Sequence, residues 1–121
     1  MPKKIMVIED ELDLLKIITF RIKKSGYEII TATDGNTGIA LIEEHRPDLI
    51  LLDLRIPGID GWEVCRRIKG HKQLCYIPVI LLSASVCEIN DETVKQIGAQ
   101  DYLRKPFEPQ SLIEKIKKLI G

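Results

Sequence analysis

The residues Leu49-Ile50-Leu51-Leu52 form a continuous apolar run that ends on the carboxylate of Asp53. A run of this kind is typical of a strand covered on both faces, as in the middle of a parallel sheet. Pro57, Gly58 and Gly61 follow and predict a loop. Asp53 is therefore expected at the carboxyl end of a buried strand, the edge of open α/β sheets where ligands bind. A charge there requires compensation, and a bound cation is one form of it.

Four further segments have the composition of strands, and stretches of helical periodicity separate them. The expected strands are residues 4–8, 27–33, 49–52, 78–82 and 101–104. Apolar residues at helical spacing predict a helix after four of the strands, and Asn90-Asp91-Glu92 predicts the start of a short helix after the strand at 78–82. Asp60 and Glu63 have capping-box spacing at the start of the third helix. Five strands alternating with five helices indicate a doubly wound α/β fold, with a parallel sheet and helices on both faces.

The composition limits the class of protein. The chain has 121 residues, and we expect one domain over residues 1–121. Lysine plus arginine and aspartate plus glutamate both number 18, and this balance argues against a nucleic-acid-binding surface. Cys65, Cys75 and Cys87 lack disulfide-framework or zinc-site spacing and are expected to be small buried or half-buried residues. No signal peptide or membrane-spanning run is visible, so we expect a soluble cytoplasmic protein.

Polar side chains follow four of the expected strands. They are Glu9 and Asp10 after the first, Asp53 after the third, Ser83 after the fourth and Lys105 after the fifth. Because the carboxyl ends of parallel strands share one edge of the sheet, these side chains are expected to converge. Grouped carboxylates form a hard oxygen site that suits Mg²⁺. One carboxylate can then act as a nucleophile toward phosphorus, while the metal and the lysine neutralise the transferring phosphoryl group.

The whole chain resembles the response-regulator receiver domains of two-component signalling, and in particular the chemotaxis regulators. The motifs that carry the resemblance are Ile8-Glu9-Asp10-Glu11, Leu52-Asp53-Leu54-Arg55-Ile56-Pro57-Gly58-Ile59-Asp60-Gly61, Leu82-Ser83-Ala84 and Asp101-Tyr102-Leu103-Arg104-Lys105-Pro106-Phe107. Each motif is modest alone, but their order and spacing are specific. The resemblance implies a flavodoxin-like (βα)5 fold with strand order 2-1-3-4-5, which chemotaxis receivers exemplify.

The resemblance also implies a phosphoacceptor and a metal site. Asp53 would accept a phosphoryl group from a phosphohistidine. Mg²⁺, with Mn²⁺ as an acceptable substitute, would be held by Asp10, by Asp53 and by the backbone carbonyl of Arg55. Glu9 stands where aspartate is also common in the family, so its metal contact is expected to be longer or mediated by water.

Three more residues have implied roles in phosphoryl binding and switching. Ser83, at a position where threonine is common, would bind a phosphoryl oxygen. Lys105 would pair with the carboxylates first and with the phosphoryl group afterwards. Tyr102 would be the aromatic switch residue. The alternative interpretation is that Tyr102 is an ordinary half-buried tyrosine of a strand. The bond between Lys105 and Pro106 is commonly cis in this family, as X-Pro bonds permit.

Two residues are implied to tune dephosphorylation. In the family, the side chains two positions after the phosphoacceptor and two after the hydroxyl residue flank the path of the attacking water. Here these are Arg55 and Ser85. The Arg55 guanidinium donates hydrogen bonds but cannot accept them, so it would obstruct water without activating it, whether it lies over the phosphoryl group or pairs with a nearby acid. We therefore expect slow dephosphorylation, unless Arg55 simply points into solvent.

The implied partners are a sensor histidine kinase or a histidine phosphotransfer protein, together with an unknown output domain or target. Direct binding to nucleic acid or membranes is not expected, and the chain is expected to be a monomer or a weak homodimer. Catalysis would be limited to self-phosphorylation and self-dephosphorylation with Mg²⁺. The resemblance is equally compatible with a stand-alone receiver and with a receiver that is part of a kinase or a transcription factor.

Three other functions compete with this reading. A phosphatase of the haloacid dehalogenase type also uses a strand-end aspartate and Mg²⁺, but it carries a second aspartate where this chain has Arg55. A flavodoxin-like cofactor binder needs a phosphate-binding loop after the first strand, where Glu9-Asp10-Glu11 would repel phosphate. A degenerate receiver that serves only as an interaction module would not need the intact set of acidic, hydroxyl and lysine residues.

Overall fold

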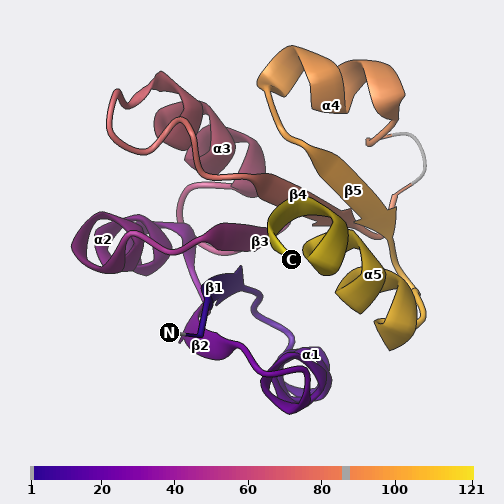
Figure 1. Cartoon of the computed structure of the whole chain (residues 1–121). Helices are drawn as coiled ribbons and strands as arrows, with labels where there is room; N and C mark the ends of the chain where they lie inside the picture. The colour runs from indigo at the N-terminus through magenta and orange to yellow at the C-terminus, as the bar shows by residue number, and fades with distance from the viewer. Residues whose placement is uncertain (1, 86–87) are drawn as a thin grey trace.

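The computed structural model describes residues 2–85 and 88–121 and contains a five-stranded parallel sheet with five helices (Figure 1). The strands are β1 (Lys4–Ile8), β2 (Glu28–Ala32), β3 (Leu49–Asp53), β4 (Val79–Ser83) and β5 (Asp101–Arg104). The helices are α1 (Leu12–Lys24), α2 (Gly35–His45), α3 (Gly61–Gly70), α4 (Asp91–Ile97) and α5 (Pro109–Ile120). The strand order is β2-β1-β3-β4-β5, so the expected doubly wound topology is confirmed.

Helices cover the sheet on both faces and create two cores. α1 and α5 pack on one face, where Ile18 and Ile116 are among the buried side chains, and α2, α3 and α4 pack on the other (Figure 1). Along β1, Ile5 and Val7 contribute to the core under α1 and α5, whereas Met6 and Ile8 contribute to the other. None of the helices in residues 2–85 and 88–121 has the length and apolar character needed to cross a membrane.

The central strands explain the continuous apolar runs of the sequence. Every residue of β3 and of β4 is buried. Because successive side chains of a strand point to opposite faces, a strand with a core on each side must be apolar at every position. β3 extends through Asp53 and β4 through Ser83, so both polar side chains are the last residues of fully covered strands. The fold therefore carries them to the edge of the sheet without interrupting either core.

The capping box expected at Asp60 and Glu63 is incomplete. Asp60 Oδ1 accepts a hydrogen bond from the Glu63 amide at 2.9 Å, as an N-cap does. The Glu63 carboxylate instead pairs with Arg67 at 2.9 Å, one helical turn further along. A complete capping box occurs at the start of α4, between Asn90 and Thr93. The prediction of a return bond from the Glu63 side chain to the Asp60 amide was wrong, because Arg67 on the same helical face competes for the Glu63 carboxylate.

The cysteines differ from one another in exposure. Cys65 belongs to α3 and points into the core that α2, α3 and α4 cover, and burial raises the pKa of its thiol to about 11. Cys75 is exposed, which corrects the expectation that it is buried or half-buried. It lies in the turn before β4, where its thiol approaches the Lys72 carbonyl at 3.6 Å instead of entering a core. Cys87 lies outside the described residues.

Gly61 allows α3 to start directly against the end of β3. A Cβ atom at this position would lie 2.5 Å from the carbonyl oxygen of Asp53 and 2.5 Å from the Cα atom of Leu54. Both are backbone atoms, so relief of the clash would require the end of β3 to move. The Gly61 amide also donates a hydrogen bond to the Leu54 carbonyl at 2.9 Å. The absence of a side chain at Gly61 therefore allows the loop after Asp53 to turn directly into α3.

Gly61→Ala is expected to lower the free energy of unfolding by about 1–3 kcal/mol, the usual range for overpacking. Gly70→Ala is the control, because a Cβ atom at this last position of α3 meets no atom within 4 Å. Alanine also favours helix over glycine, so the control should be neutral or slightly stabilising. Urea unfolding followed by circular dichroism measures both variants. Equal stabilities would show that the contact at Gly61 does not matter.

Candidate functional site

The carboxyl ends of β1, β3, β4 and β5 bring the predicted polar residues to one edge of the sheet. These strands are consecutive neighbours, so the residues at their ends form a continuous row. Glu9 and Asp10 follow β1, Asp53 ends β3, Ser83 ends β4 and Lys105 follows β5. Parallel pairing therefore collects groups that are distant in sequence, as the topology rule for open α/β sheets predicts.

Lys105 connects the acidic residues of this edge. Its Nζ atom lies 3.0 Å from Asp53 Oδ2, 2.8 Å from Glu9 Oε1 and 3.3 Å from Glu11 Oε1. Burial opposes the charged form of Lys105, but the carboxylates of Glu9 and Asp53 outweigh it and hold its pKa above the usual range. The ammonium therefore keeps its positive charge beside the Asp53 carboxylate.

Glu9 is the most deeply buried of the acidic residues, with no exposed surface. Its burial, together with the neighbouring Asp53 and against the pull of Lys105, raises its pKa to about 7. Glu9 Oε2 accepts a hydrogen bond from the Glu11 amide at 3.1 Å. Its Oε1 atom lies at ion-pair distance from Lys105 but accepts no hydrogen bond of good geometry from the described residues. This oxygen therefore has room for another positive partner.

The donor set fits a hard divalent cation. One carboxylate oxygen from each of Glu9, Asp10 and Asp53 can be placed within 4.8 Å of the others. Asp10 is exposed, which leaves the cluster open to solvent on that side. The backbone amide of Arg55 donates to Asp53 Oδ1 at 3.1 Å and holds the Arg55 backbone beside the carboxylate. Mg²⁺ prefers a few carboxylates with water and phosphate oxygens, and the Glu9 oxygen that pairs with Lys105 but accepts no hydrogen bond of good geometry from the described residues fits that preference.

The hydroxyl of Ser83 has a partner that the sequence did not indicate. Ser83 Oγ is buried and lies 3.1 Å from Glu88 Oε2, in the loop between β4 and α4. The same Glu88 oxygen lies 3.4 Å from Arg55 Nε. Arg55 therefore pairs with an acid although 74% of its side chain is exposed. Glu88 lies in a loop, where no helical or strand periodicity relates its side chain to Ser83. The contact between the two is therefore visible only in the folded structure.

Ser85 lies beside the same hydroxyl. Its backbone amide donates to Ser83 Oγ at 3.1 Å, and its carbonyl lies 3.3 Å from that oxygen. The Ser85 backbone thus helps to position Ser83.

Tyr102 lies away from the carboxylates, on the surface shared by β5 and α4. Its ring is half-buried and its hydroxyl donates to Asp91 Oδ1 at 2.7 Å, a bond that raises the pKa of the phenol. The Arg104 guanidinium lies over the ring, 5.5 Å from its centre. The peptide bond between Lys105 and Pro106 is cis in the structure.

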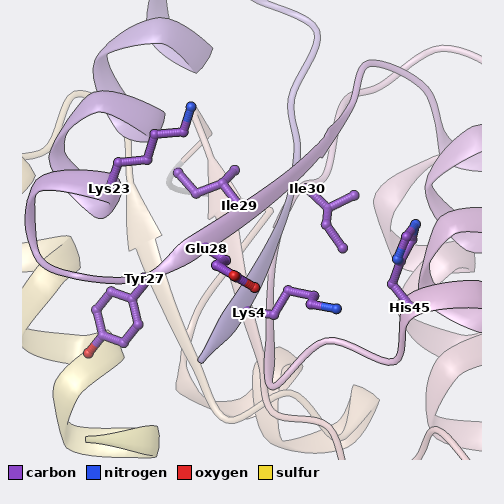
Figure 2. Close-up of a pocket in the computed structure, with 7 residues that line it drawn as sticks. All are labelled: Lys4, Lys23, Tyr27, Glu28, Ile29, Ile30 and His45. Carbon is purple, nitrogen blue, oxygen red and sulfur yellow. The ribbon is translucent and has the colours of Figure 1, made fainter. Parts of the chain in front are cut away.

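An open pocket of about 580 Å³ at the edge strand β2 is separate from this site (Figure 2). Lys4 and Glu28, which line it, are the first residues of β1 and β2, at the sheet edge opposite to the carboxylates. Its basic residues Lys4, Lys23 and His45 come from three elements and lie apart in Figure 2. Among the described residues, the acidic group that could hold a metal lies instead at the carboxylate edge.

Comparison with known proteins gives a consistent result. The family model described as the response regulator receiver domain matches residues 5–117. A putative response regulator from Chloroflexus aurantiacus J-10-fl is 29% identical, with a TM-score of 0.89 and 98% of each chain covered. A CheY-like response regulator receiver domain protein from Methanospirillum hungatei JF-1 is 29% identical, with a TM-score of 0.87, covering 98% of this chain and 93% of that one.

A third similar structure contains a metal. The receiver domain of the sensor histidine kinase PA1611 from Pseudomonas aeruginosa PAO1 is 30% identical, with a TM-score of 0.90. The match covers 100% of this chain and 99% of that one. The structure of that protein has a magnesium ion coordinated in its active site cleft.

Mg²⁺ binding is expected to strengthen as the pH rises from about 6 to 8, because the metal competes with the proton on Glu9, whose pKa is raised to about 7. Below that pKa the affinity should fall, by at most about tenfold per pH unit, and above it the affinity should level off. Calorimetric titration at several pH values measures this dependence.

Glu9→Gln should weaken Mg²⁺ binding and flatten its pH dependence, because the glutamine side chain does not ionise in this pH range. Glu43→Gln, an exposed change of the same kind on α2, should behave like the unchanged protein. An affinity in the unchanged protein that is constant from pH 6 to 8 would refute the role of Glu9.

Proposed function

Because this chain belongs to the response regulator receiver domain family, we propose that it accepts a phosphoryl group on Asp53 with the help of Mg²⁺ and signals through the resulting change in its surface. The observation that carries the proposal is the placement of Asp53. It is 4% exposed, at the carboxyl end of β3, with Lys105 at 3.0 Å from one carboxylate oxygen. Its other oxygen accepts from the Arg55 amide, within the acidic cluster that fits a metal.

The chemistry proposed for this edge is transfer from phosphohistidine to carboxylate. An oxygen of Asp53 bonds to phosphorus while the phosphorus–nitrogen bond of the donor breaks, and the electron pair of that bond stays on the imidazole. Bound Mg²⁺ supplies positive charge to the phosphoryl oxygens. Lys105 keeps its ammonium beside the new group, and Ser83 has a hydroxyl hydrogen to donate to a phosphoryl oxygen. Asp10, Asp53 and the backbone carbonyl of Arg55 would hold the metal, and Glu9 would contact it at longer range or through water.

Membership of the family also supports a proposal about the donor. Receivers pair with histidine kinases, and the Pseudomonas aeruginosa relative is itself the receiver of a sensor histidine kinase. A receiver domain is a signalling module and not an enzyme that turns over small phosphate esters. Arg55 supports this reading against a phosphatase, because it supplies no carboxylate where the haloacid dehalogenase type has its second aspartate. We propose a histidine kinase or a histidine phosphotransfer protein as the donor.

Acetyl phosphate with Mg²⁺ is expected to add one phosphoryl group per chain, and Asp53→Asn should abolish the addition because an amide is a poor nucleophile. Asp13→Asn, an exposed change of the same kind on α1, should be labelled like the unchanged protein. Intact-protein mass spectrometry gives the stoichiometry. Labelling of Asp53→Asn at the unchanged rate would show that another residue is the acceptor.

The proposed readout uses Ser83, Lys105 and Tyr102. A phosphoryl group adds close to two negative charges and strong hydrogen-bond acceptors at Asp53. Ser83 and Lys105 are drawn to it, and the space left by Ser83 favours an inward position of the Tyr102 ring. The Tyr102 hydroxyl would then leave Asp91, its partner at 2.7 Å, and change the surface of α4, β5 and α5.

The proposed lifetime of the phosphoryl group depends on Arg55. Its guanidinium already pairs with Glu88, so it is drawn to anions within reach of the site. After phosphorylation it would lie against the phosphoryl oxygens and obstruct the attacking water. Ser85, the other flanking residue, has a small side chain that gives water little activation.

Arg55→Asn is therefore expected to lose its phosphoryl group several-fold faster than the unchanged protein, because an amide can orient water and a guanidinium cannot. Phosphorylated samples are freed of donor, kept in excess Mg²⁺ and followed by phosphate release. Arg67→Asn, which removes the same charge from an exposed position of α3, serves as the control. A rate in Arg55→Asn that matches this control, or falls below it, would remove Arg55 from the mechanism.

A further inference from the structure

Glu88 lies among the groups that the proposed reaction needs, although no role has been assigned to it. Its Oε2 atom is 3.1 Å from the Ser83 hydroxyl oxygen and 3.4 Å from Arg55 Nε. Its side chain is 18% exposed, so the contact with Ser83 is partly shielded from water. One carboxylate oxygen therefore engages both side chains that would otherwise face the phosphoryl group.

The hydroxyl of Ser83 can serve only one strong acceptor at a time, because it has a single hydrogen. Its neighbours are the Glu88 carboxylate at 3.1 Å and the Ser85 carbonyl at 3.3 Å, and the Ser85 amide already donates to its oxygen. Hydrogen bonds to a charged acceptor are the stronger ones, so the carboxylate is the favoured partner. A phosphoryl oxygen on Asp53 must compete with Glu88 for this hydrogen.

Charge leads to the same conclusion. A phosphoryl group on Asp53 and the carboxylate of Glu88 are both anions, and Ser83 and Arg55 are the groups that both can use. Two anions on one hydroxyl hydrogen repel each other strongly in a partly buried setting. The phosphorylated state is therefore incompatible with the present position of Glu88.

We propose that Glu88 is a positioning residue that holds Ser83 and Arg55 in the unphosphorylated arrangement and must leave when Asp53 is phosphorylated. We call Ser83, Arg55 and Glu88 the Glu88 latch. The inference rests on the proposed function of Asp53 and adds a competing anion within the chain itself. The latch weakens phosphoryl binding in the resting state, and its release frees Arg55 to turn toward the phosphoryl group.

The chain after Glu88 connects the latch to the signalling surface. The next residue, Ile89, is buried, and its carbonyl accepts a hydrogen bond from Arg104 on β5 at 2.9 Å. Asp91, at the start of α4, accepts the Tyr102 hydroxyl. Displacement of Glu88 would therefore move a short segment that makes two hydrogen bonds to β5. Release of the latch is expected to disturb both bonds together.

Beryllofluoride, with Mg²⁺ in excess, is the probe, because it adds a phosphoryl-like group to a carboxylate without a protein donor. Its affinity is measured by nuclear magnetic resonance titration for the unchanged protein, Glu88→Gln, Glu88→Ala and the control Glu92→Gln. Glu92 is exposed in the first turn of α4, so its variant removes the same charge nearby. The Glu88 variants should bind about threefold to tenfold more tightly than the control.

The effect must also depend on Ser83. In a Ser83→Ala background, Glu88→Gln should lose most of its effect, because the shared hydroxyl is gone. Glu88 variants that bind no more tightly than Glu92→Gln, or that keep their full effect without Ser83, would overturn the Glu88 latch. If the unchanged protein itself fails to bind beryllofluoride with Mg²⁺, the proposed function of Asp53 fails, and the latch fails with it.

Discussion

The interaction on which the site depends is the contact of one lysine ammonium with buried carboxylates at the carboxyl ends of two strands. Lys105 reaches Asp53 and Glu9 within 3.0 Å, and all three side chains are largely removed from solvent. Burial disfavours the charged form of Glu9, and the neighbouring Asp53 carboxylate disfavours it further. The pKa of Glu9 is therefore raised although Lys105 lies beside it. The arrangement is therefore prepared for additional positive charge. A divalent cation bound at this acidic cluster would supply that charge.

The sheet makes this concentration of charge possible. The apolar side chains of β1, β3 and β4 enter two cores that helices cover on both sides, and this burial stabilises the sheet without help from the polar edge. The charged groups stand only where the strands end. Gly61 then lets α3 start directly against the backbone at Asp53, because it has no side chain to clash there. The two apolar cores thus offset the cost of gathering charged side chains at the ends of the strands.

Charges and hydrogen bonds also link the site to a distant surface. Glu88 contacts Ser83 at the site, Ile89 contacts Arg104, and Asp91 contacts Tyr102. These three partners of β4 and β5 lie within four consecutive residues of the chain, 88–91. Under the proposed function, a change in charge at Asp53 would reach α4 through this short stretch of chain. These contacts are the ones on which the proposed readout of Asp53 depends.

By itself, the sequence determined the alternation of strands and helices, the burial of the central strands and the identity of the edge where Asp53, Ser83 and Lys105 meet. These features follow from periodic apolar residues and from the rule that parallel strands end together, so they are local or topological. Only the tertiary structure decided that Cys75 is exposed, that Glu63 binds arginine and that Glu88 holds both Ser83 and Arg55. Such contacts depend on loop conformation and on competition between several possible partners, and no period in the sequence encodes the outcome of that competition.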